Sequence, residues 1–279
     1  MTTPVLPLPQ LFAALLLTLG VALPAPAQQG PRSVLGPPAI AGITVTVESG
    51  ARRDSVSASR FNSRADSLSW VRTRDASLRA SGRRLIVSIH ERRLWWMNGA
   101  DTIYSAPVAV GTGLRLESRE GTWEFSTPRG VRRVLAKEKN PVWTPPDWHY
   151  VELAQDSAFG LVRLQRGRGV PLNDGSRVVV RGERIGRILP DGRYEELPAD
   201  EEIIVGRTIF IPPLGTANRR IAGELGAYKL DMGDSYLLHG TPHKDSIGTA
   251  ATHGCIRLHD EDLEYIYRNI PVGTAVYIY

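Results

Sequence analysis

Cysteine is nearly absent from this sequence, because Cys255 is the only one among 279 residues. No disulfide can form within the chain, so a fold held together by internal disulfides is excluded. A single thiol usually packs as a small buried hydrophobe, and in some proteins it carries chemistry. The residues around Cys255 decide between these two interpretations.

The sequence also lacks internal repeats, a glycine-rich phosphate loop and, after residue 27, any apolar run that reads as a membrane span. Apolar residues concentrate in 11–23, and Ala25-Pro26-Ala27 then matches a signal-peptide cleavage pattern. We therefore predict a signal peptide over 1–27 and an exported protein, periplasmic or associated with the cell wall. No cysteine follows the cleavage site, which argues against lipoprotein anchoring.

The charges are mixed along the chain rather than gathered in runs. Lys and Arg together number 34 against 29 Asp and Glu, which gives a net charge of +5. Because basic and acidic residues alternate and the chain is predicted to be exported, nucleic acid is not an expected partner. The positive net charge is compatible with an anionic wall polymer as partner.

Residues 28–83 are rich in Pro, Ser and Arg and are predicted to be a linker that contains one helix. Between residues 60 and 78 the apolar residues recur at near-helical intervals: Phe61, Leu68, Val71 and Leu78. We expect an amphipathic helix that packs these residues on the outside of the following domain.

From Arg84 the pattern changes to β-strands. Three apolar runs cover 85–90, 94–98 and 102–111, and Asn98-Gly99 between the last two is a strong hairpin signal. Near the end of the chain, acidic residues at 260–262 and an apolar stripe ending before Pro271 predict a helix. Residues 274–279 are predicted to form the last strand.

Residues 163–202 are predicted to be an inserted β-hairpin region. Turns are expected at Asn173-Asp174-Gly175 and at Pro190-Asp191-Gly192. The region is interpreted either as a lid over a groove or as a solvated surface excursion. After it, residues 203–213 and 226–233 are expected to return to strands of the central core.

Residues 236–258 hold the lone cysteine together with several histidines, in the stretch YLLHGTPHKDSIGTAATHGCIRL. If 252–258 is extended, its period of two places His253, Cys255 and Arg257 on one face. His239 is expected at the end of an upstream strand, joined to this segment by an ordered loop, residues 240–252. The pattern predicts that these side chains meet.

A cysteine nucleophile needs a base or a cation beside it, because its ordinary pKa of about 8.5 leaves little thiolate at neutral pH. His239 and His253 are the two candidates for the base. The backbone N–H groups of Gly254 and Cys255 are candidate donors to an oxyanion. Zinc is the alternative, although the spacings match none of the common zinc templates. Its ligands would come from a larger set: His239, His243, His253, Cys255 and His259.

The stretch from His239 to Leu258 closely resembles the signature of the YkuD-type L,D-transpeptidases, in which His-Gly-Thr and Ser/Thr-His-Gly-Cys bracket a loop of this size. Residues 84–113, 126–134, 140–146 and 226–233 support the resemblance, which covers roughly 84–279. It implies a mainly β catalytic domain over 84–279, a sandwich or distorted barrel with one or two short helices. It also implies an enzyme without cofactor or metal.

The resemblance assigns roles to individual residues. Cys255 would be the nucleophile and His239 the general base, its other ring nitrogen oriented by a backbone carbonyl near Gly240. His253 would support the site, and Gly254 would supply an oxyanion N–H. Residues expected to bind substrate are Arg257, which would hold a carboxylate or stabilise the loop, and Gly240, Thr241 and Trp143. The alternative for Trp143 is a structural role, because an indole beside two prolines packs well without a ligand.

The implied reaction is peptidoglycan L,D-transpeptidation. Cys255 would attack the carbonyl of the L-centre of meso-diaminopimelate in a tetrapeptide stem, release D-alanine and form a thioester. The acceptor would be another diaminopimelate, a lysine of an outer-membrane protein, or water in an L,D-carboxypeptidase. The motif does not choose among these acceptors. The non-enzymatic alternative is a wall-binding module that kept the groove without the activity.

Overall fold

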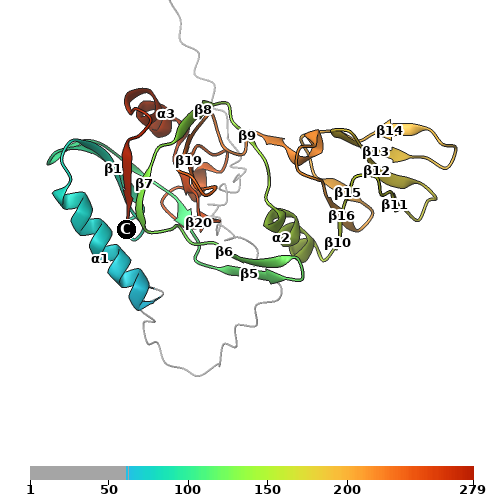
Figure 1. Cartoon of the computed structure of the whole chain (residues 1–279), viewed down its shortest axis with the longest axis horizontal. Coiled ribbons are helices and arrows are strands. Elements are labelled where there is room, and N and C mark those ends of the chain that lie inside the picture. Colours follow the sequence, from blue (N-terminus) through green and yellow to red (C-terminus); the bar gives the residue numbers. More distant parts are fainter. Residues whose placement is uncertain (1–60, 62) are drawn as a thin grey trace, which may run out of the picture. The chain divides into compact units, whose positions relative to one another are not determined.

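The computed structural model of the protein describes residue 61 and residues 63–279 (Figure 1). The predicted signal peptide and the part of the predicted linker before residue 61 lie outside the described residues. The fold is mainly β, as the sequence predicts, with three α-helices among the described residues: α1 (Arg64–Arg79), α2 (Asp147–Ser157) and α3 (Asp260–Asn269). None of the helices in this described part is long and apolar enough to cross a membrane.

A five-stranded sheet contains most of the early strands, in the order β3-β2-β1-β22-β7. The predicted turn at Asn98-Gly99 joins β2 to β3, and Gly99 has the positive φ of 58° that such a turn requires. The last strand pairs in parallel with β1. The bounds are β1 (Arg83–Ser88), β2 (Arg93–Asn98), β3 (Asp101–Pro107), β7 (Gly130–Arg133) and β22 (Ala275–Ile278).

A four-stranded sheet in the order β21-β19-β18-β8 carries the sequence motif. Its strands are β8 (Ala136–Lys139), β18 (Tyr228–Asp231), β19 (Leu237–His239) and β21 (Ile256–Arg257). Helix α3 packs on β18 and β19. Side chains from both sheets and from α3 form one hydrophobic core, which includes Leu85, Val87, Leu230, Leu238, Ile256, Leu263 and Ile266. This core fixes the strands that bear His239 and Arg257.

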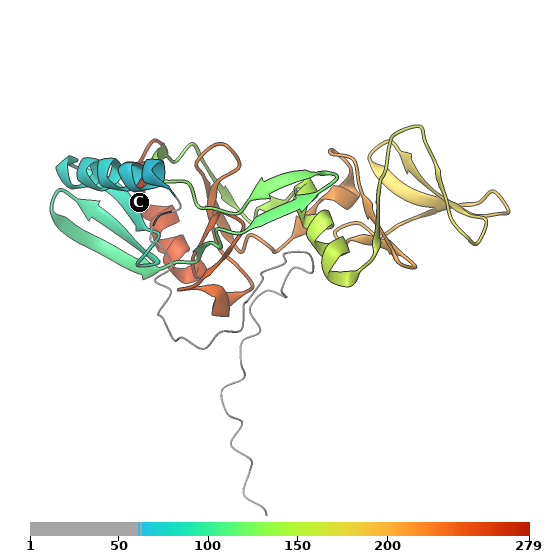
Figure 2. The same cartoon turned by 90° about the horizontal axis from the view of Figure 1, so that it is seen from below.

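Helix α1 lies against β22 and β7 (Figure 1, Figure 2), but not through the face that the sequence predicted. Leu68 and Val71 are each 44% exposed and Leu78 is 63% exposed. Thr73 and Ser77 are buried instead. The predicted apolar stripe is therefore wrong, because the buried side of the helix carries Thr73 and Ser77, and the ring of Trp70 meets that of Tyr279 edge to face. An ion pair of 2.6 Å between Arg129 and Asp66 also holds this face.

The region after α2 forms a second set of sheets, here called the β-module (residues 160–211). One sheet has the order β10-β16-β15 and the other β11-β12-β13-β14. Five buried residues form its own hydrophobic cluster: Leu164, Val178, Ile185, Ile203 and Phe210. Its strands are β10 (Gly160–Arg163), β11 (Val170–Pro171), β12 (Arg177–Arg181), β13 (Arg184–Ile188), β14 (Tyr194–Glu196), β15 (Ile203–Val205) and β16 (Thr208–Ile211).

The expectation that residues 203–213 return to the central core is wrong. β16 pairs in parallel with β10, and β15 pairs with β16, so both belong to the β-module. Ile209 and Ile211 pack with Tyr150 and Ala154 of α2. An apolar run of this kind fits any buried strand, and its pairing with β10 cannot be read from the run itself.

The chain enters and leaves the β-module side by side. β9 (Val142–Trp143) pairs with β17 (Ile221–Ala222), and η1 (Ala217–Arg219) precedes β17. Arg219 is 2% exposed and donates hydrogen bonds to the carbonyls of Pro145 and Pro212, at 2.7 and 2.6 Å. The guanidinium also pairs with the Asp147 carboxylate at the start of α2 and lies over the ring of Tyr150. These bonds join the two ends of the insertion.

The remaining elements surround the motif. β4 (Val110–Gly111) pairs in parallel with β20 (Ala250–Thr252), and β5 (Arg115–Ser118) forms a hairpin with β6 (Gly121–Glu124). A short 3-10 helix, η2 (Lys244–Ser246), lies in the loop between the two halves of the motif.

Candidate active site

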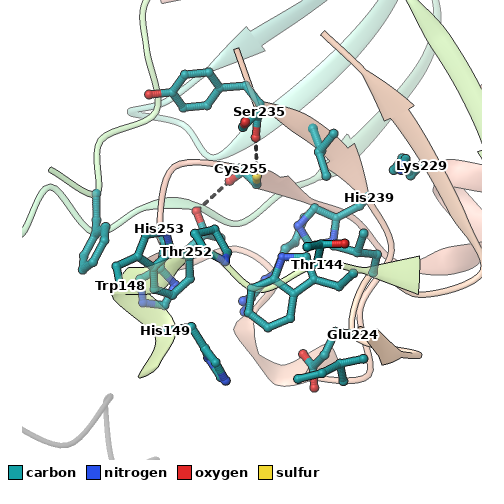
Figure 3. Close-up of a pocket in the computed structure, with 18 of the residues that line it drawn as sticks. Thr144, Trp148, His149, Glu224, Lys229, Ser235, His239, Thr252, His253 and Cys255 are labelled. Atoms are coloured by element: carbon teal, nitrogen blue, oxygen red, sulfur yellow. Dashed lines mark hydrogen bonds between the residues drawn. The ribbon is translucent and has the colours of Figure 1, made fainter. Parts of the chain in front are cut away.

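A cavity of about 740 Å³ lies where the motif meets α2 and β9 (Figure 3). Its wall contains most of the side chains that the sequence singled out: Trp143, His239, His253, Cys255 and Arg257. The cavity also has residues that the sequence analysis did not name as site residues, including Trp148, His149, Glu224, Lys229 and Tyr236. Residues far apart in the chain thus share one concave surface.

Strand pairing brings the two histidine segments together. β19 and β21 are parallel, with Leu238 opposite Ile256 and His239 opposite Arg257. The expectation that 252–258 forms one extended strand is wrong, since β20 ends at Thr252 and β21 begins at Ile256. The backbone turns at Gly254, whose φ is 121° and where an added Cβ would lie 3.1 Å from the Ser126 carbonyl oxygen. Glycine is therefore required there.

The thiol of Cys255 faces the backbone of the preceding loop. Its Sγ atom lies 3.7 Å from the carbonyl oxygen of Ser235, a residue with a φ of 64° (Figure 3). Burial raises the pKa of this thiol, while a backbone hydrogen bond from Leu237 and the charge of Arg257 act in the opposite direction. The group is therefore held as a neutral thiol before a ligand binds.

His239 is enclosed at the end of β19, where it is 4% exposed. Its Nδ1 atom lies 2.6 Å from the carbonyl oxygen of Gly240. A carbonyl only accepts, so Nδ1 carries the proton and Nε2 keeps its lone pair. Burial, and then the charge of Arg257, lower the pKa of His239 to about 3. The ring is neutral across the physiological range.

Arg257 brings a cation into the same wall. Burial lowers the pKa of its guanidinium, which Glu224 partly offsets. Its Nε atom is buried and has no hydrogen-bond partner among the residues that the structure describes. An unpaired buried donor costs free energy, and a carboxylate ligand would satisfy it.

His253 is held by three side chains. Its ring stacks on Trp148, with centroids 4.0 Å apart and planes at 19°, and meets the edge of Phe125 at 4.4 Å. Its Nε2 atom lies 2.8 Å from Oε2 of Glu152. Trp148 and Glu152 are one turn apart on α2, so one helix face supplies both contacts. Sequence reasoning missed Glu152, because nothing in the helix pattern links it to a distant histidine.

The N–H of Gly254 is already used within the chain. It donates to Oγ1 of Thr252 at 3.1 Å, and that hydroxyl donates to the carbonyl of Cys255 at 2.6 Å. The expectation that Gly254 offers a free oxyanion donor is therefore not met in this structure. The N–H of Cys255 makes no hydrogen bond to any described residue, which leaves it as the available donor.

Gly240 and Thr241 do not line the cavity. A Cβ on Gly240 would lie 1.7 Å from Oδ1 of Asp260, and Thr241 is 1% exposed. Oγ1 of Thr241 accepts a hydrogen bond from the backbone N–H of His243 at 3.0 Å. The expectation that these two residues contact substrate is therefore contradicted by their packing, which serves the loop.

Two ion pairs involve further side chains of the cavity wall. His149 of α2 lies 2.9 Å from Glu202, and this hydrogen bond lowers the pKa of Glu202. Lys229 lies 2.7 Å from Glu138. Among the described residues, no group of three His, Cys, Asp or Glu side chains is arranged to hold a metal ion, so the zinc ligand set considered from the sequence is not assembled.

Residues 82–278 match one protein-family model, YkuD, described as the L,D-transpeptidase catalytic domain. The Escherichia coli K12 protein named "Probable L,D-transpeptidase ErfK/SrfK" is 26% identical over 196 residues. That alignment covers 70% of this chain but only 43% of the relative. A second Escherichia coli K12 protein, "Probable L,D-transpeptidase YbiS", is 42% identical over 52 residues, 19% of this chain and 17% of that protein.

Solved structures that are similar to this chain include those of two L,D-transpeptidases. The L,D-transpeptidase from Xylanimonas cellulosilytica has a TM-score of 0.38 at 13% identity, covering 72% of this chain and 61% of that one. The catalytic domain from the E. faecium L,D-transpeptidase has a TM-score of 0.35 at 12% identity, covering 72% and 99%.

Proposed function

Because the chain belongs to the YkuD family of L,D-transpeptidase catalytic domains, which are acyltransferases, we propose that it is a peptidoglycan L,D-transpeptidase with Cys255 as the nucleophile. The observation that carries the proposal is the meeting of Cys255, His239 and Arg257 in one cavity wall. The donor is a tetrapeptide stem, and the first product is a thioester on Cys255.

In the acylation step, the sulfur of Cys255 attacks the carbonyl of the L-centre of meso-diaminopimelate, and D-alanine leaves. Nε2 of His239, which has the free lone pair, accepts the thiol proton and passes it to the nitrogen of the departing D-alanine, so the ring is neutral again after acylation. The raised pKa of the thiol and the pKa of about 3 for His239 both disfavour a separated ion pair. Proton transfer therefore accompanies the attack rather than preceding it.

Hydrogen-bond donors of the cavity wall stabilise negative charge on the substrate. The N–H of Cys255 supports the oxyanion of the tetrahedral intermediate. The N–H of Gly254 can join it only when substrate draws it away from Thr252. Arg257 holds a substrate carboxylate through the guanidinium that lacks a partner at Nε. Trp143 forms part of the apolar wall beside the stem peptide.

The acceptor defines the product. Diaminopimelate as acceptor gives a cross-link, a lysine of an outer-membrane protein gives an anchored protein, and water gives a carboxypeptidase. We favour a transpeptidase because the cavity wall includes the exposed carboxylate of Glu124, which suits an ammonium acceptor. A wall-binding module without activity would not need the proton-accepting nitrogen of His239.

The proposal includes export. Residues 1–27 act as a signal peptide and 28–83 as a linker with a helix, which place the catalytic domain, 84–279, at the periplasmic or outer face of the membrane where peptidoglycan lies. Within that domain, 163–202 is an insertion in the catalytic fold. Its role as a lid is a proposal supported by the contact of Glu202 with His149 in the cavity wall.

Intact-protein mass spectrometry tests the function. The protein is incubated with a carbapenem and, separately, with a disaccharide tetrapeptide plus an amine acceptor. The expected results are a covalent adduct on Cys255 and release of D-alanine with formation of the amide product. A folded, reduced protein that forms no adduct and turns over no stem peptide would support the wall-binding module instead.

A further inference from the structure

His253 has an ionisable partner that the acylation chemistry does not use. Its Nε2 atom lies 2.8 Å from Glu152, with 28% of the His253 side chain and 22% of the Glu152 side chain exposed. An ionised carboxylate only accepts hydrogen bonds, so the proton of the neutral ring resides on Nε2. Nδ1 then keeps a lone pair, and it has no hydrogen-bond partner among the described residues.

The ring of His253 is fixed in the cavity wall. Trp148 stacks on one side of it (Figure 3). Phe125 meets it at an interplanar angle of 82°. The residue is two positions before Cys255 and lines the same cavity. The ring of His253 and a thioester on Cys255 would therefore border the same cavity.

The two histidines of the cavity have opposite surroundings. His239 is enclosed beside the cation Arg257 and has no carboxylate partner, which makes it a weak proton acceptor in the free enzyme. His253, by contrast, is hydrogen-bonded to a carboxylate, that of Glu152, and is partly exposed. The environment of His253 thus suits a step in which a proton is taken from a neutral amine in contact with water.

We propose that His253 accepts the proton of the acceptor amine in the second half-reaction and that Glu152 is the positioning residue for His253. This inference rests on the proposed transpeptidase function. It divides the two half-reactions between two histidines: His239 takes the proton of the thiol in acylation, and His253 takes the proton of the amine in aminolysis.

The second half-reaction is aminolysis of the thioester on Cys255. The acceptor ammonium loses one proton to water, and the resulting amine forms a C–N bond to the thioester carbonyl carbon while Nδ1 of His253 takes a second proton. The tetrahedral intermediate then breaks its C–S bond. The thiolate of Cys255 receives the proton held by His253, which restores the thiol and leaves a neutral amide.

Separate measurement of the two half-reactions tests this role. Acylation is followed as the burst of D-alanine released from a disaccharide tetrapeptide without acceptor. Aminolysis is followed as amide formed when meso-diaminopimelate is then added. The matched variants are Glu152→Gln, which keeps size but removes charge, and Asp156→Asn, which removes the same charge from an exposed side chain one turn further along α2. Titration with a carbapenem gives the fraction of folded sites in each variant.

Glu152→Gln is expected to slow aminolysis about tenfold and His253→Gln about 100-fold, within the range that a general base contributes. Acylation per folded site should change less than about twofold in Glu152→Gln, since no contact of Glu152 reaches His239. Asp156→Asn should leave both rates unchanged. Unchanged aminolysis in Glu152→Gln, or an equal fall of both half-reactions, overturns the proposal.

Failure of the proposed function gives a different result. In that case the wild-type protein releases no D-alanine and the variants have no burst to compare. A wild-type burst together with normal aminolysis in Glu152→Gln rejects only the role of the His253–Glu152 pair and leaves the transpeptidase intact.

Discussion

At the residue scale, the chemistry depends on which nitrogen of each histidine carries a proton. Nδ1 of His239 is bonded to the carbonyl of Gly240, and Nε2 of His253 is bonded to Glu152. The free nitrogens are therefore Nε2 in one ring and Nδ1 in the other. Each histidine can accept one proton, but their surroundings suit different steps.

His239→Ala should slow acylation by roughly 100-fold or more, the size expected for loss of a general base. His253→Ala should slow acylation much less, because its free nitrogen serves the acceptor. Stopped-flow measurement of carbapenem acylation compares the two variants directly. If His253→Ala slowed acylation as much as His239→Ala or more, the thiol would give its proton to His253.

The pH dependence of acylation should lack an inflection near 6.5. The pKa of His239 is lowered to about 3, so this base stays unprotonated as the pH falls from 8 to 5. The raised pKa of the Cys255 thiol places the rise in rate on the alkaline side. Acylation rates from pH 5 to 9 test this, and a clear loss of rate around pH 6.5 would contradict a buried, neutral His239.

At the element scale, α2 connects the β-module to the cavity. One part of the helix is buried through Tyr150, Val151 and Ala154, while Trp148 and Glu152 hold His253. The first residue, Asp147, pairs with the buried Arg219. The helix position, and with it the wall of the cavity, therefore depends on the junction where the β-module begins and ends.

Arg219→Ala should lower the free energy of unfolding by about 3 kcal/mol, because it leaves two backbone carbonyls without their donor and removes one of the two arginines paired with Asp147. Arg220→Ala is the matched control, because the side chain of Arg220 is exposed whereas that of Arg219 is buried. Chemical denaturation gives both values. A change in Arg219→Ala no larger than in Arg220→Ala would show that the junction does not depend on this side chain.

Local patterns predicted several elements well. The hairpin at Asn98-Gly99 and the helix that starts at Asp260 follow from turn chemistry and apolar spacing that act within a few residues. The motif also predicted that His239, Cys255 and Arg257 meet. Their meeting arises from the parallel pairing of β19 with β21, together with a turn at Gly254 rather than one extended strand.

Features that depend on partners distant in sequence were not predictable. The apolar side chains of α1 suggested a buried stripe, but the sheet beneath accepts the small Thr73 and Ser77 instead. The run 203–213 has no property that distinguishes a core strand from a strand of the β-module. Glu152 is 101 residues from His253 in sequence, and only the packing of α2 brings them together.

At the scale of the whole molecule, burial of a neutral histidine couples stability to pH. The folded pKa of His239 is depressed to about 3 from an ordinary value of 6.5. Below pH 6.5 the unfolded chain binds a proton that the folded chain does not, so stability falls as the pH decreases from 6.5 toward 3. Above pH 6.5 the contribution is fully present.

His239→Gln should therefore reduce the loss of stability between pH 7 and pH 5, since one such group contributes up to about 1.4 kcal/mol per pH unit. His90→Gln is the control, because His90 is exposed. Chemical denaturation at pH 7 and at pH 5 gives the free energy of unfolding of each protein, and the difference between the two values is its loss of stability. An identical loss in wild type and His239→Gln would show that His239 is protonated in the folded state.

The most direct test of the central claim follows D-alanine release from a disaccharide tetrapeptide by wild type and by Cys255→Ala, with circular dichroism to verify the fold. Wild type should release D-alanine and gain the mass of the acylated stem on Cys255. The Cys255→Ala variant should keep the fold, carry no adduct and release none. D-alanine release by the folded variant at the wild-type rate would remove the thiol from the mechanism.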